Sequence, residues 1–140
     1  MTGRLVGVLA LVLVMSLFAL PVSASQSEGE VQPLSTYYLA SWESWPTDNG
    51  NGFVKICGYS EATQPVSSIS VRIYLQKWNG SGWTNVDSVY KPASGTDYVW
   101  GEKTIAAQRG ATYRTKSEHY ASHNGKTDFK TYISGSIVLK

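Results

Sequence analysis

The sequence predicts an all-β domain built as an antiparallel β-sandwich of about seven strands. Short segments in which apolar and polar residues alternate recur along the chain, and turn residues separate them. No segment after residue 24 has the period of a helix. Aromatic residues make up 12% of the chain and charged residues 16%, which is the composition of a folded domain and not of a disordered one.

Residues 1–24 are expected to be a signal peptide and not part of the fold. Arg4 supplies a positive charge, residues 5–20 are almost wholly apolar, and small residues end the segment at Ala24. The apolar run is shorter than the ~20 residues that a spanning helix needs, which favours cleavage over a membrane anchor. We therefore expect a secreted, extracellular protein with no stable membrane anchor after cleavage.

The rest of the chain divides into a flexible leader at residues 25–34 and a β-sandwich domain at residues 35–140. The leader is polar and contains no aromatic residue. The length after cleavage fits one domain. Basic residues then exceed acidic residues by only one, because Arg4 leaves with the signal, and this balance does not suggest a nucleic-acid partner.

The first two strands are expected at residues 35–45 and 53–59, on either side of a polar turn. A connection at residues 62–67, which contains Pro65, should follow. Cys57 lies on the second strand and is the only cysteine, so no internal disulfide can form. A buried apolar role is favoured for it, with a reactive thiol or an intermolecular bridge as alternatives.

Residues 69–91 are predicted to form a long β-hairpin around which the other strands are organised. Alternate residues from Ile69 to Leu75 are apolar, and a turn at residues 79–82 places Trp78 opposite Trp83. With no irregularity, residues directly opposite share a face. The core side would then contain the pairs Leu75–Val86, Ile73–Ser88 and Val71–Tyr90.

Further strands are expected at residues 98–107, 111–121 and 127–139, the last two as a hairpin. A two-residue turn at Asn124 and Gly125 would mix polar and apolar residues on each face. We prefer a three-residue loop that begins at His123. It pairs Thr115 with Ile133, His119 with Phe129 and Glu118 with Lys130, so that Phe129, Thr131, Ile133 and Ile137 face the core.

Two stretches resemble a group of small exported bacterial proteins of unknown function, mostly from Gram-positive lineages. One runs from Gly110 through Tyr113, Arg114, Lys116 and His119 to Ala121, followed by Asn124-Gly125; the other spans residues 74–86. The resemblance covers roughly residues 53–139. It implies an immunoglobulin/fibronectin-III-like sandwich and export, and it brings no activity. Tyr113 also resembles the tyrosine that makes a structural hydrogen bond at the corner of such domains.

No set of residues has the spacing of a catalytic centre, a metal site or a cofactor site. His119 and His123 are separated by a strand and its turn, and no carboxylates cluster with them. His119 is expected at the edge of the core with its ring hydrogen-bonded. A small hydrolase or a thiol enzyme that uses Cys57 or His119 is the weakest alternative.

The candidate site is an outer face on which aromatic rings lie beside cations. The first hairpin is expected to share a sheet with the last two strands. Such a face suits sugar rings and anionic polymers. We therefore expect a non-enzymatic protein that binds cell-wall glycan or an anionic polymer at the cell envelope. The alternative is a protein-interaction module, such as an inhibitor or adhesin-like subunit, that binds another exported protein. The expected ligand-binding residues are Arg72, Tyr74, Trp78, Trp83, Arg114, Lys116, Tyr120 and Tyr132.

Overall fold

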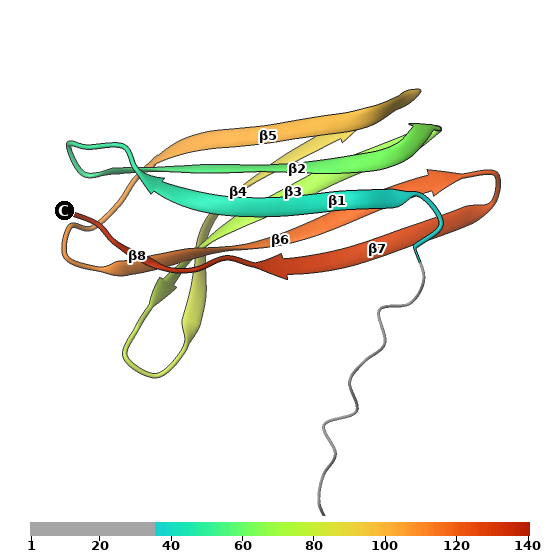
Figure 1. The fold of residues 1–140 in the computed structure, drawn as a ribbon. Coiled ribbons are helices and arrows are strands. Elements are labelled where there is room, and N and C mark those ends of the chain that lie inside the picture. Colours follow the sequence, from blue (N-terminus) through green and yellow to red (C-terminus); the bar gives the residue numbers. More distant parts are fainter. Residues whose placement is uncertain (1–35) are drawn as a thin grey trace, which may run out of the picture. The chain divides into compact units, whose positions relative to one another are not determined.

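The computed structural model describes residues 36–140, so the expected signal peptide and leader lie outside the described residues. The described chain is all-β and its strands are antiparallel (Figure 1). It has eight strands where the sequence predicted about seven. No helix in this part of the chain is long and apolar enough to cross a membrane.

The strands form two sheets. The first sheet has the order β1-β2-β5, with β1 at Leu39–Asp48, β2 at Phe53–Val66 and β5 at Thr96–Ala106. The second has the order β4-β3-β6-β7, with a short β8 beside β6. Its strands are β3 at Ser68–Trp78, β4 at Trp83–Ala93, β6 at Thr112–His123, β7 at Lys126–Ile133 and β8 at Ile137–Val138. The expected sharing of one sheet by the first hairpin and the last two strands is confirmed.

Apolar side chains from both sheets meet in one core. Ile69, Val71, Ile73 and Leu75 on β3 are fully buried, as their alternation predicted. They pack in one cluster with residues of the first sheet such as Val54 on β2. Because side chains alternate across a strand, the residues between them on β3 point to the outer face of the second sheet.

The predicted register of the first hairpin holds at its tip and is wrong beyond Gln76. Trp78 pairs with Trp83 and Gln76 with Asn85, but Leu75 then pairs with Asp87, because a β-bulge adds Val86 to β4. The shift moves every later residue of β4 by one position. Val86 and Tyr90, which we expected in the core, are each 48% exposed.

The last hairpin uses a two-residue turn at Asn124 and Gly125, and the three-residue loop that we expected is wrong. Asn124 and Gly125 both have positive φ angles, 48° and 74°, and His123 pairs with Lys126. These angles are those of a type I′ turn, whose twist matches that of the flanking strands. Consequently Phe129 and Ile133 are exposed and do not face the core. The prediction was wrong because it assumed that the apolar residues of β7 face the core, whereas they lie on the outer face.

Several strand boundaries also differ from the prediction. β2 continues through the expected connection at residues 62–67 as far as Val66, and it accommodates Pro65 where its pairing with β5 is irregular. The first strand begins at Leu39 and not at residue 35. The single strand expected at residues 127–139 is divided into β7 and β8.

A buried carboxylate on β7 fixes the start of the folded domain. Asp128 pairs across the sheet with buried Ala121 and is 5% exposed. Its Oδ1 accepts the backbone N–H of Tyr37 at 2.9 Å, and its Oδ2 accepts those of Tyr38 at 2.6 Å and Leu39 at 2.9 Å. Burial by itself raises the pKa of Asp128, but the three backbone donors outweigh it and lower the pKa below its ordinary value.

Tyr113 makes the structural hydrogen bond that its resemblance implied. Its ring is buried at the start of β6. The hydroxyl accepts the backbone N–H of Gln108 at 2.9 Å and donates to the carbonyl of the same residue at 3.3 Å. The connection from β5 to β6 is thereby tied to the sheet that it enters.

Candidate functional site

The outer face of the second sheet combines cations and aromatic rings, and we call it the basic face. Seven of the eight predicted site residues lie on it, because they alternate with core residues on β3 and β6 or flank the hairpin tip. Tyr90 joins them as a result of the bulge in β4. The basic face is defined by the charged residues Arg72, Arg114, Lys116 and Glu118 and by the rings of Tyr74, Trp78, Trp83, Tyr90 and Tyr120.

Two arginines on this face are stacked on rings of β4. The guanidinium carbon of Arg114 lies 4.3 Å from the centre of the Trp83 ring, and that of Arg72 lies 4.4 Å from the Tyr90 ring. The rings of Trp83 and Trp78 are 5.4 Å apart and tilted by 58°. Stacking holds a guanidinium in place and leaves its edge available for a planar anion.

A buried glutamine positions Arg114. Gln76 is 7% exposed although it lies on the outer face. Its Oε1 accepts from Nε of Arg114 at 2.9 Å, and its Nε2 donates to Oδ1 of Asn85 at 2.9 Å. The guanidinium is therefore fixed by a hydrogen bond as well as by the ring of Trp83.

The cations of the basic face outnumber its carboxylates. The two ion pairs in residues 36–140 join Lys55 to Glu102 and Lys103 to Asp87. Neither pair involves Arg72, Arg114 or Lys116. Glu118 is the one carboxylate among the paired positions of this face. Burial and then the negative charge of Glu118 raise the pKa of Tyr74, so its hydroxyl stays protonated at neutral pH.

Tyr132 does not lie on the basic face. It pairs with Ser117, which points into the core, so it belongs to the inner side of β7 near the edge of the sheet. Lys130, expected to be outside opposite Glu118, pairs with buried His119 instead, and its Nζ lies 5.9 Å from the Trp42 ring of β1. The two-residue turn explains both errors, since a shift of one residue exchanges the faces of a strand.

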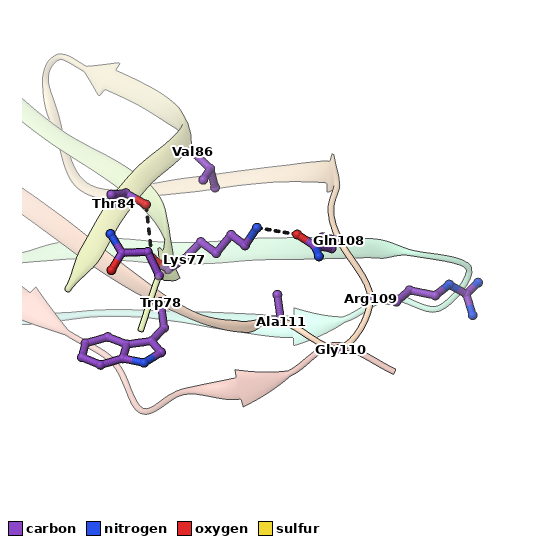
Figure 2. Close-up of a pocket in the computed structure, with 9 residues that line it drawn as sticks. Lys77, Trp78, Thr84, Val86, Gln108, Arg109, Gly110 and Ala111 are labelled. Atoms are coloured by element: carbon purple, nitrogen blue, oxygen red, sulfur yellow. Dashed lines mark hydrogen bonds between the residues drawn. The ribbon is translucent and has the colours of Figure 1, made fainter. Parts of the chain in front are cut away.

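An open groove of about 700 Å³ adjoins Trp78 at the tip of the first hairpin (Figure 2). The connection between β5 and β6 forms its other side. Lys77 reaches across the groove and donates to Oε1 of Gln108 at 2.5 Å, while Arg109 points away from it (Figure 2). The groove extends the surface beside Trp78, and the ammonium of Lys77 keeps its positive charge there because its partner is a neutral amide.

The structure encloses His119 in a chain of hydroxyl groups between the two sheets. Its Nδ1 lies 2.8 Å from Oγ of Ser60, and its Nε2 lies 2.7 Å from Oγ of Ser117. Ser117 donates to Ser44, whose hydroxyl is 2.7 Å from that of Thr115. All five side chains are almost completely buried. The ring was expected at the edge of the core and is instead inside it, hydrogen-bonded as predicted.

Burial lowers the pKa of His119 to about 4, so the ring is neutral at neutral pH. A neutral imidazole between two hydroxyls has the groups of a proton-transfer system, but a substrate has no access to a fully enclosed ring. The arrangement joins the two sheets through hydrogen bonds at the centre of an otherwise apolar core.

Cys57 and His119 are not brought together. Cys57 is on the outer side of β2, paired with Trp45 and Glu102, and it is buried beneath its neighbours. Burial raises the pKa of the Cys57 thiol, which keeps it protonated at neutral pH. Among the described residues, no three His, Cys, Asp or Glu side chains converge as a metal site would require.

Comparison with known proteins finds no matching family and no matching curated protein. One solved structure, described as a protein from Archaeoglobus fulgidus, aligns with 73% of this chain and 98% of its own at 10% identity, with a TM-score of 0.35. A similarity of this size carries no argument about function. The resemblance to small exported bacterial proteins stays a prediction.

Proposed function

We propose that this chain is an exported, non-enzymatic binding domain of the immunoglobulin/fibronectin-III-like sandwich type. The strand order supports this assignment. β1, β2 and β5 correspond to strands A, B and E of such domains, and β3, β6 and β7 to strands C, F and G. β4 pairs with β3 as an additional strand of the second sheet. The tie between Tyr113 and Gln108 lies at the corner where these domains have their tyrosine.

The proposed ligand is an anionic polymer of the cell envelope, bound on the basic face. The observation that carries the proposal is Arg114, which is stacked on Trp83, hydrogen-bonded to Gln76 and in neither of the ion pairs found within residues 36–140. A fixed guanidinium loses little conformational freedom on binding, so more of its attraction for phosphate or carboxylate appears as affinity. Arg72 and Lys116 extend the positive charge along the sheet.

Rings beside these cations suit a polymer that also contains sugars. Trp78 is 41% exposed and Tyr90 is 48% exposed, so flat apolar surface is available next to the charges. The expected signal peptide at residues 1–24 would place the domain outside the cell membrane, where envelope polymers are found. Export and ligand are thus two parts of one proposal.

Binding to isolated cell walls tests the proposal. The protein recovered from the culture medium should sediment with walls at low salt, and the double variant Arg114→Gln/Lys116→Gln should sediment markedly less. A control with the same change in net charge, Lys91→Gln/Lys140→Gln, removes exposed cations that lie off the basic face and outside the groove, and it should behave as the wild type. Equal retention of both double variants would reject the basic face as the binding surface.

A further inference from the structure

The outer face of the first sheet carries a second group of aromatic rings, which was not predicted from the sequence. The rings of Tyr59 and Tyr98 are stacked with their centres 5.9 Å apart, and those of Trp45 and Trp100 meet at 5.5 Å. Tyr59 and Trp100 are direct cross-strand partners, so the four rings form one strip across β1, β2 and β5. Tyr98 and Trp100 are 44% and 39% exposed.

Carboxylates accompany this strip. Strand pairing places Glu43 beside Tyr59, Glu61 beside Tyr98 and Glu102 beside Cys57. We call this surface the acidic face, defined by Glu43, Glu61, Glu102 and Lys55 and by the rings of Trp45, Tyr59, Tyr98 and Trp100. Lys55 lies 3.0 Å from Glu102 and lowers the pKa of that carboxyl. Neither ion pair in the described chain involves Glu43 or Glu61.

The two outer faces are complementary in charge. The acidic face carries three carboxylates and one lysine, whereas the basic face carries three cations and one carboxylate. Both faces also present exposed rings. Because the core lies between the sheets, the two faces lie on opposite sides of the domain (Figure 1). The two faces of one copy therefore cannot meet each other, but the acidic face of one copy can meet the basic face of another.

We propose that the acidic face of one copy docks on the basic face of a second copy. The same contact can repeat at both sides of each molecule, so the association is head-to-tail and produces open chains of copies in place of a closed dimer. Opposite charges set the orientation, and the rings provide apolar surface at the contact. An anionic polymer on the basic face occupies one side of this contact, so polymer and self-association compete.

The size of the smaller face sets the strength of the contact. Three strands at a spacing of about 4.8 Å and ten residues at about 3.3 Å each give a face of roughly 14 Å by 33 Å. Two such faces bury about 900 Å² in total, which is below the ~1,200 Å² of standard specific interfaces. The contact is therefore weak and reversible, and it depends on ionic strength because its charges lie at the surface.

Sedimentation velocity on the exported protein tests the proposal over about a hundredfold range of concentration that reaches the high micromolar region. At low salt the average mass should rise with concentration, and added salt should return it to the monomer. The variants Glu43→Lys/Glu61→Lys and Arg72→Glu/Lys116→Glu should each stay monomeric. An equimolar mixture should associate again, because one variant keeps a native acidic face and the other a native basic face.

A wild-type protein that stays monomeric at every concentration in low salt overturns the proposal, as does a mixture that associates no more than its components. Thermal unfolding of both variants verifies that they are folded. The variant Glu43→Gln/Glu61→Gln also separates this inference from the proposed function, because it leaves the basic face intact and adds no cation. It should lose self-association and still bind inorganic polyphosphate.

Discussion

Acid should destabilise this protein through His119 before most carboxylates titrate. The pKa of the ring is about 4 in the folded domain against 6.5 in an unfolded chain. The unfolded state therefore binds a proton at a pH where the folded state does not. The resulting stability is complete above about pH 6.5 and is lost as the pH falls toward 4, because each proton taken up by the unfolded state favours unfolding.

The size of this loss follows from the two pKa values. Linkage gives a decrease in the free energy of unfolding of about 2 kcal/mol between about pH 7.5 and pH 5. Carboxylates whose pKa is lowered in the fold, such as Asp87 and Asp128, contribute their own losses mainly below about pH 4.5, closer to their unfolded values. Between pH 6.5 and 5 the change in the free energy of unfolding therefore comes mainly from His119.

Urea unfolding at a series of pH values measures the effect. The wild type should lose stability across this interval, and His119→Gln, which cannot take up a proton, should show a nearly flat profile whatever its absolute stability. His123→Gln is the matched control and should keep the wild-type slope. A wild-type profile that is flat from pH 6.5 to 5, or a His119→Gln profile with the wild-type slope, would refute the reasoning.

Two further substitutions test how the domain is held together. Asp128→Asn replaces one carboxylate oxygen by an amide donor that faces backbone N–H groups, so it should cost about 2–4 kcal/mol of stability in chemical unfolding. The control Asp97→Asn, at an exposed position of β5, should cost less than about 0.5 kcal/mol. Gly58→Ala would place its Cβ 2.7 Å from the carbonyl oxygen of Glu43 and should cost about 1–3 kcal/mol, while Gly82→Ala meets no atom within 4 Å and should be nearly neutral. Equal losses of stability for Asp128→Asn and its control would contradict the role given to the backbone hydrogen bonds. Equal losses for Gly58→Ala and its control would contradict the close packing at Gly58.

Much of the fold follows from local sequence pattern. The alternation from Ile69 to Leu75 predicted a strand with one buried face, and the turn that follows predicted that Trp78 faces Trp83; both are correct. The sharing of a sheet by this hairpin and the last two strands is also correct. These features depend on short-range periodicity and on turn residues, which a single sequence contains.

The errors arose where tertiary contacts override that pattern. The β-bulge at Val86 has no local signature, and it reverses the faces of the rest of β4. On β7 the apolar residues Phe129 and Ile133 face outward, while the polar Asp128 faces inward because it binds backbone groups about ninety residues earlier in the chain. Neither a bulge nor a long-range carboxylate anchor can be inferred from the periodicity of one strand.

The same limit applies to the candidate site. The sequence placed seven of eight residues on one face because β3 and β6 follow simple alternation, and it missed Tyr90 and misplaced Tyr132 because β4 and β7 do not. The sequence did not predict the acidic face, because its rings come from three strands and β5 is far from β1 and β2 in the chain. The strand order β1-β2-β5 places Trp45, Tyr59 and Trp100 on the same outer face of the first sheet.

The salt dependence of binding to soluble polyphosphate tests the central claim, an anion-binding basic face, most directly. Three neutralised cations predict that the logarithm of the association constant falls with the logarithm of salt concentration with a slope of about −2, at roughly −0.7 per charge on a single-stranded polyanion. Arg114→Gln/Lys116→Gln should weaken binding and reduce the slope to about −0.7. A variant that binds as tightly as the wild type, with the same slope, would contradict the claim.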